Sequence, residues 1–87
     1  MNRVYRALSD PTRRRILELL RENDMTAGEI ATQFDLAKPT LSGHFAVLRE
    51  AGLIHGDRTG TSIKYRLNVS VLEEALWALL ESFKIRR

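Results

Sequence analysis

The first long stretch of helical periodicity follows a short apolar opening, Val4 to Leu8. It begins at Ser9-Asp10-Pro11 and ends near Glu22, and a side-chain cap followed by proline is typical of a helix start. One side of this helix is apolar and consists of Ile16, Leu17, Leu19 and Leu20. Arg13 falls within the same side, so it needs a carboxylate such as that of Asp10, or a bound phosphate.

Two further helices follow in close succession. Thr26 and Glu29 have the spacing of a capping box, which predicts a short helix over 27–34. A tight connection at 35–37 leads to a helix over 38–51, and Gly52 is placed to end it in the left-handed conformation. The spacing predicts that this second helix buries Leu41, Phe45 and Leu48.

The periodicity then changes to alternation, which predicts a β-hairpin. Its strands are 53–58 and 61–67, and Thr59-Gly60 supplies the turn. Ser70 and Glu73 have the spacing of a second capping box, so a last helix should open there and run close to Arg87.

This last helix is apolar over about half of its circumference, whereas an ordinary surface helix needs a stripe of roughly 100°. We therefore expect it to bury one side on its own body and another on a partner. An ordinary core helix with Trp77 exposed is the alternative, and membrane-surface binding is less favoured because the polar face has charges of both signs. The apolar positions are Val71, Leu72, Ala75, Leu76, Leu79, Leu80 and Phe83.

The order of helices and hairpin is that of a winged helix-turn-helix. The sequence thus predicts a mainly α (α+β) fold with a two-stranded β-hairpin wing, and residues 1–87 as a single domain. The second helix of such a pair fits the major groove of DNA. Its predicted outward side is small and uncharged and consists of Pro39, Thr40, Ser42, Gly43, Ala46 and Val47.

Several of these positions have chemistry that suits DNA. The hydroxyls of Thr40 and Ser42 can hydrogen-bond to base edges or phosphates. Gly43 would let the helix backbone approach closely, or it is a tolerated surface glycine. Lys38 lies where helix N–H groups also favour a phosphate, or it is a solvated lysine. His44, at the edge of the buried side, either contacts DNA or is a satisfied boundary histidine.

The hairpin is the second candidate surface. Its residues either follow the DNA backbone and place an arginine in the minor groove, or form an ordinary solvated hairpin. In the segment 51–70 basic residues outnumber acidic ones, since Asp57 is the only carboxylate there. The candidate contacts of the hairpin are Arg58, Thr59, Gly60, Thr61 and Lys64.

Composition excludes several classes of protein. The 87 residues are 44% hydrophobic and 29% charged, ordinary values for a globular domain, and the net charge of +3 allows an anionic partner. The absence of cysteine excludes disulfides and thiolate metal sites. Without a long apolar run or a signal peptide, we expect a cytoplasmic protein with no membrane partner.

An enzyme is disfavoured. Ser42 and His44 are two residues apart on a helix, so their side chains diverge by about 200° and form no nucleophile–base pair. No glycine-rich phosphate-binding loop is present. The remaining alternative to a DNA-binding protein is a protein-interaction module that docks a different protein on the last helix.

Four segments of the chain together resemble the ArsR family of bacterial winged-helix repressors, and most closely its small metal-free autorepressors. The four segments are ALSDPTRRRILELL, MTAGEIATQF, KPTLSGHFAVLREAGLI and RTGTSIKYRLN. The resemblance implies a homodimer, built through the first helix with Val4 and the last helix, that blocks transcription from an operator with two half-sites. It places the recognition helix, about 38–51, in the major groove and the wing, about 55–65, on the backbone or minor groove. The recognition positions it implies are Lys38, Pro39, Thr40, Ser42, Gly43 and His44, with the wing tip around Arg58 to Thr61.

Much of the family senses metals through a cysteine motif on the recognition helix, or through His and Asp/Glu ligands on the last helix. This chain departs from both patterns, because it has no cysteine and its histidines, His44 and His55, precede the last helix. Transition-metal sensing usually needs nitrogen or sulfur ligands. We expect no metal and no cofactor, and an unknown protein or small-molecule signal stays open.

Overall fold

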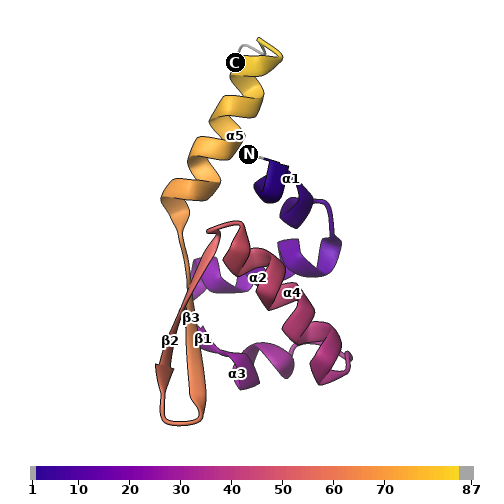
Figure 1. The fold of residues 1–87 in the computed structure, drawn as a ribbon, viewed down its shortest axis with the longest axis vertical. Coiled ribbons are helices and arrows are strands. Elements are labelled where there is room, and N and C mark those ends of the chain that lie inside the picture. Colours follow the sequence, from indigo (N-terminus) through magenta and orange to yellow (C-terminus); the bar gives the residue numbers. More distant parts are fainter. Residues whose placement is uncertain (1, 85–87) are drawn as a thin grey trace.

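The computed structural model describes residues 2–84, which form five helices and a three-stranded antiparallel sheet (Figure 1). The helices α2, α3 and α4 lie on one side of the sheet. The helix α5 projects from one end of the molecule, and the hairpin tip lies at the other end. Along the chain the elements are α1 (Asn2–Leu8), α2 (Pro11–Glu22), β1 (Met25–Thr26), α3 (Ala27–Ala31), α4 (Lys38–Glu50), β2 (Ile54–Thr59), β3 (Ser62–Leu67) and α5 (Val69–Ser82).

Local capping residues start two of the helices as predicted. Asp10 caps α2, where its Oδ1 accepts hydrogen bonds from the backbone N–H groups of Thr12 at 2.8 Å and Arg13 at 3.2 Å. The capping box of α3 is formed, since the side chains of Thr26 and Glu29 each accept the other's backbone N–H. However, α3 ends at Ala31 rather than Phe34, because tighter turns follow it, and the connection to α4 therefore spans 32–37.

Folding stabilises the charged form of Asp10. Partial desolvation raises the pKa of this carboxyl, but the hydrogen bonds from the backbone N–H groups of Arg13 and Thr12 outweigh it and lower the pKa below its usual value. A lowered pKa contributes stability that is fully present above the unfolded pKa and is lost as the pH falls through the folded pKa. Asp10 therefore contributes to acid unfolding.

We expect Asp10→Asn, which keeps the capping oxygen but removes the charge, to weaken this acid response. The free energy of unfolding of the variant should fall less steeply than that of the wild type below about pH 5. Asp10→Ala, which also loses the cap, should be about 1 kcal/mol less stable at pH 7. Urea unfolding followed by circular dichroism at several pH values measures both effects, and equal acid slopes for wild type and Asp10→Asn would contradict the prediction.

The side chain of Arg13 holds the end of α1. Its Nε donates to the carbonyl oxygen of Ala7 and its Nη2 to that of Arg6, both at 2.9 Å, while Arg14 donates to Leu8 at 2.8 Å. The last carbonyls of a helix lack intrahelical donors and carry partial negative charge, so cationic donors suit them. The predicted pairing of the Arg13 guanidinium with the Asp10 carboxylate is wrong, because backbone carbonyls of α1 take its place.

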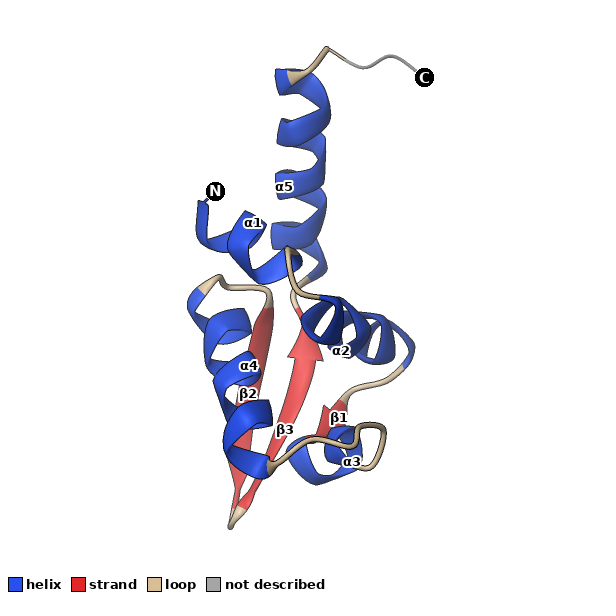
Figure 2. Cartoon of the chain, turned by 90° about the vertical axis from the view of Figure 1, so that its right-hand side faces the viewer, coloured by secondary structure: helices blue, strands red, loops and turns tan. Residues whose placement is uncertain are grey.

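The core lies between α2, α4 and the sheet (Figure 2). Leu41, Phe45 and Leu48 of α4 are buried, which confirms the predicted stripe. Val47, predicted to face outward, packs against the core and is a correction, because the buried side of α4 is wider than three residues. The other buried members of this core include Ile16, Leu17, Leu20, Ile30, Leu53, Ile54 and Tyr65.

The sheet has the order β1-β3-β2. The hairpin pairs Ile54 with Leu67 and Thr59 with Ser62, so its two-residue loop is Gly60-Thr61, one residue later than predicted. Gly60 has φ +61°, which suits the first loop position of a type II′ turn. The short β1, which pairs with Lys64 and Tyr65 of β3, was not predicted.

The last helix differs from its prediction at both ends. It begins at Val69 because Leu72 N–H donates to the carbonyl of Asn68, so Ser70 lies inside the helix and caps nothing. It ends at Ser82, and Lys84 takes a left-handed φ of +53°. Arg86 and Arg87, which the prediction included, lie outside the described residues. Within residues 2–84, no helix is long and apolar enough to cross a membrane.

Candidate nucleic-acid interface

The start of α4 and the tip of the hairpin lie at the same end of the molecule, away from α5 (Figure 2). The predicted contacts of α4 are exposed at Lys38, Pro39, Thr40, Ser42 and Gly43. The predicted contacts of the hairpin tip, Arg58 to Thr61, are exposed as well. The fold thus brings the two candidate surfaces to one end, as a DNA-binding winged helix requires.

The first turn of α4 offers donors for an anion. Ala37 occupies the N-cap position and makes no side-chain cap, and Lys38 and Pro39 follow it. The backbone N–H groups of a first helical turn have no intrahelical partner, and Pro39 has none to offer. The N–H groups of Lys38 and Thr40, together with the Lys38 ammonium and the Thr40 hydroxyl, therefore suit a phosphate.

Lys38 and Ser42 also line a hollow of about 230 Å³ between α3 and α4. The opposite wall has only small side chains, those of Ala27, Gly28 and Ala31. Hydrogen-bonding groups at such a rim are placed to meet a ligand that enters from solvent.

Gly43 has no packing reason to be glycine. A Cβ added there would meet nothing within 4 Å. Since glycine inside a helix costs about 1 kcal/mol relative to alanine, the residue weakens α4 without relieving any contact in this chain. A close approach by another molecule is an explanation that fits both facts.

His44 is half-buried, and its Nδ1 lies 3.2 Å from Nη1 of Arg13. The contact joins α4 to the residue that holds the end of α1. Sequence periodicity placed Arg13 within the apolar side of its helix and His44 at the edge of another, but gave no signal that they would meet.

The wing is joined firmly to α4 through Tyr65. The rings of Tyr65 and Phe45 stack with centroids 4.7 Å apart, and Arg49 Nη1 donates to the Tyr65 hydroxyl at 3.3 Å. Gly56 faces Tyr65 across the hairpin, and a Cβ there would lie 2.9 Å from Tyr65 Cε1. The hairpin and α4 are therefore held in one relative position, which sequence analysis did not predict.

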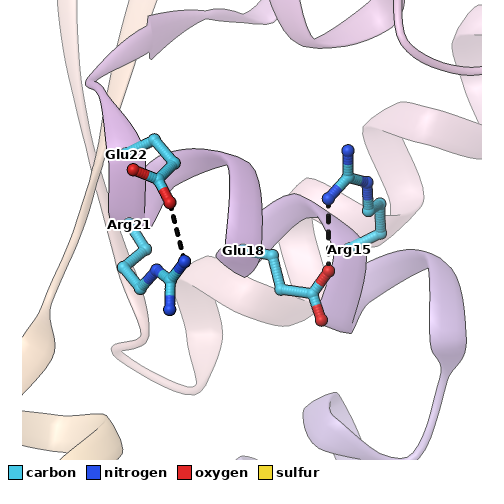
Figure 3. A network of polar contacts seen from close by, with 4 residues as sticks. All are labelled: Arg15, Glu18, Arg21 and Glu22. Atoms are coloured by element: carbon cyan, nitrogen blue, oxygen red, sulfur yellow. Dashed lines mark hydrogen bonds and ion pairs between the residues drawn. The ribbon is translucent and has the colours of Figure 1, made fainter.

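Charge pairing distinguishes the basic side chains. On the outer face of α2, Arg15 pairs with Glu18 at 3.3 Å and Arg21 with Glu22 at 2.6 Å (Figure 3). These exposed pairs leave that face without a net positive patch. By contrast, neither Lys38 nor Arg58 has an ion-pair partner within residues 2–84.

Lys64 is the predicted hairpin contact that lies farthest from the tip. It lies on the central strand β3 rather than at the hairpin tip, and it is directly opposite Asp57 in the register. The attraction between Lys64 and Glu29 also contributes to lowering the pKa of Glu29, after the larger effects of the Thr26 hydrogen bonds. Lys64 therefore has carboxylates nearby, although it forms no ion pair within residues 2–84.

The predicted dimer contacts divide into three groups by exposure. Val4 is 6% exposed and Ala75 is fully buried inside the chain, so these two side chains have little or no area to offer a partner. Val71 and Leu72 are partly buried against the same core, and Leu80 is half-buried. Leu76, Leu79 and Phe83 are exposed and form what we call the α5 stripe. Val69 and Trp77 are exposed too, although the prediction left them out of the interface.

The candidate metal ligands of the chain are few and dispersed. Cysteine is absent from the chain, and α5 has no histidine. Within the described part of the chain, no three His, Cys, Asp or Glu side chains are grouped so as to hold a metal ion.

Comparisons with known proteins agree with this fold. The repressor SdpR of Bacillus subtilis strain 168 is 49% identical over 91% of this chain and 89% of its own. An ArsR-like transcriptional regulator from Rhodococcus sp. RHA1 has a TM-score of 0.85 at 29% identity, over 95% of this chain and 76% of that one. The homodimeric winged helix-turn-helix DNA-binding domain of Mb0332 from Mycobacterium bovis has a TM-score of 0.75 at 31% identity, with the same coverage.

The predicted winged helix-turn-helix fold is confirmed by these structures. A family model described as "Bacterial regulatory protein, arsR family" matches residues 10–55, from the cap of α2 to the second residue of β2. The match spans the helix-turn-helix itself, and the relatives extend it over both flanking helices and the wing. This chain belongs to the arsR family of bacterial regulatory proteins.

Proposed function

We propose that this protein is a transcriptional repressor that binds double-stranded DNA as a homodimer, on an operator with two half-sites. Each protomer acts as one domain in the cytoplasm, where bacterial DNA lies. The observation that carries the proposal is the shared end of the molecule at which the start of α4 and the hairpin tip are exposed together. Membership of the arsR family makes the chain a regulator rather than an enzyme.

In this proposal α4 enters the major groove. Thr40 and Ser42 contact base edges or phosphates, Gly43 allows close approach, and Lys38 binds a phosphate beside the first turn. Pro39 shapes that turn. At the wing Arg58, Thr59 and Thr61 contact the DNA backbone or the minor groove, and Lys64 contributes least because carboxylates lie near it.

The second part of the proposal is dimerisation through the α5 stripe. Leu76, Leu79 and Phe83 are large apolar side chains exposed on a helix that projects from its own body. Contiguous exposed apolar surface of this kind marks an interaction site. SdpR, which shares nearly the whole length of this chain, is a transcriptional repressor, and the Mb0332 domain is homodimeric.

We further propose that no transition metal controls the repressor. The support is the composition of the chain, which lacks cysteine altogether and lacks histidine on α5. A signal, where one acts, would be a small molecule or a protein.

The test is selection of sequences from a random duplex library by the purified protein, with its mass in solution measured alongside. We expect a dimer and an enriched site whose two halves lie about one helical turn apart. Affinity for that site should fall steeply as salt rises, because phosphate contacts release counterions. The upstream DNA of its own gene then serves as a probe of self-regulation.

A monomer that enriches no sequence and binds all duplexes alike would contradict the proposal. That result would instead favour the alternative, a winged-helix module that docks a different protein on α5.

A further inference from the structure

The Arg13 guanidinium connects three helices. Two of its nitrogens donate to the carbonyls of Arg6 and Ala7 at the end of α1, and the third, Nη1, lies 3.2 Å from Nδ1 of His44 on α4. The side chain itself belongs to α2. Three contacts from one planar group leave it little freedom to turn.

This contact determines which nitrogen of the His44 ring carries the proton. A guanidinium has only donors, so Nδ1 of His44 must accept. The neutral ring then has its proton on Nε2, which becomes a donor. The hydrogen bond at Nδ1 also fixes the orientation of the ring, and hence the direction of the Nε2–H bond.

The Nε2 atom is at least partly accessible to solvent. No buried side-chain nitrogen or oxygen lacks a partner in residues 2–84, and within this range Arg13 is the one hydrogen-bond partner of the His44 ring. His44 lies four residues after Thr40 and next to Gly43, on the half of α4 that the proposed function places in the major groove. The outward donor is therefore available to a DNA acceptor.

We propose that Arg13 is a positioning residue for operator recognition: it fixes the ring of His44 so that Nε2–H donates to an acceptor on DNA. The acceptor is a guanine N7 or O6, or a phosphate oxygen. The inference rests on the proposed function. It adds to that function a role for Arg13, which lies on the apolar side of α2 and acts on DNA only through His44.

The arrangement has a matched control within the same helix. Arg14 also donates to a terminal carbonyl of α1, that of Leu8, but within residues 2–84 it makes no hydrogen bond to α4. Arg14→Gln therefore shows how weakening the end of α1 alone changes operator affinity. Arg13→Gln shows the combined effect of weakening the end of α1 and losing the His44 contact.

The first experiment needs no DNA. Nitrogen-15 spectra of the free protein at pH 8, where a histidine is neutral, should show His44 with Nε2 protonated and Nδ1 accepting a hydrogen bond. The Nδ1 signal should move in Arg13→Gln and stay in place in Arg14→Gln. A wild-type ring with its proton on Nδ1, or equal signals in both variants, would overturn the inference even if the protein binds its operator.

The second experiment is a double-mutant cycle on operator affinity. We expect Arg13→Gln and His44→Ala each to weaken binding about tenfold, and Arg13→Gln to add less than about twofold in the His44→Ala background. Arg14→Gln should stay within about twofold of the wild type. Additive losses, or equal losses in the two arginine variants, would show that Arg13 does not act through His44.

Two further substitutions decide the matter if Arg13→Gln is unfolded. His44→Gln places an amide donor near the Nε2 position and should keep most of the affinity, whereas His44→Asn should bind as weakly as His44→Ala. Equal affinities for Gln and Asn would overturn the inference. If His44→Ala loses affinity for the operator only, the acceptor is a base. If it loses affinity equally for a scrambled duplex, the acceptor is a phosphate.

Discussion

Replacing Leu76 by glutamate is expected to separate the protein into monomers. Leu76 is 45% exposed and is the first residue of the α5 stripe, with Leu79 three residues later on the same side. A carboxylate in an apolar contact without a partner is costly to bury. We expect the dimer dissociation constant to rise by about 100-fold or more, which sedimentation equilibrium measures directly.

The fold itself should survive, because Leu76 contributes little to the core of its own chain. Circular dichroism should therefore match that of the wild type. Operator affinity should also fall, since two half-sites bound by linked protomers hold more tightly than one. Leu36→Glu is the control, because Leu36 is a similarly exposed leucine (41%) in the 32–37 connection, and that variant should remain dimeric. A folded, dimeric Leu76→Glu would refute the α5 interface.

Gly43→Glu should abolish operator binding while making the free protein more stable. The added side chain meets nothing within its own chain, and glutamate favours a helix by about 0.5–1 kcal/mol over glycine. On DNA the same side chain would occupy the space needed for close approach and bring a negative charge toward the phosphates. We expect affinity to fall by about 100-fold or more, measured by fluorescence anisotropy beside urea unfolding.

Two variants make this result specific. Gly43→Ala should also gain stability, but it should lose less affinity because it adds no charge. Asn23→Glu adds the same charge at the exposed end of α2 and should bind almost as the wild type does. Wild-type operator affinity in Gly43→Glu would mean that α4 does not lie against DNA at this point.

Helix starts that depend on neighbours in the sequence were predictable. Asp10 and Thr26 form their caps with residues two or three positions away, so the pattern alone identified them. The start of α5 was not predictable in this way. Asn68 N–H donates to the carbonyl of Leu53, a contact between distant segments that fixes where the chain leaves the sheet and where the helix begins.

The candidate DNA surface was predictable for a similar reason. Helical periodicity assigned Leu41, Phe45 and Leu48 to the core and thereby identified the exposed positions around Gly43. It could not show which side chains cross between elements. The contact of Arg13 with His44 and the stacking of Tyr65 on Phe45 depend on helix packing and strand register, which one sequence does not reveal.

In the proposed repressor, the projecting position of α5 would tie gene control to protein abundance. A helix that leaves its apolar stripe uncovered in the single chain makes the proposed repressor competent only after two copies meet. Below the dissociation constant of the pair, the number of competent molecules rises with the square of the copy number. Doubling expression would then raise operator occupancy nearly fourfold, so transcription would switch over a narrow range of protein concentration without any inducer.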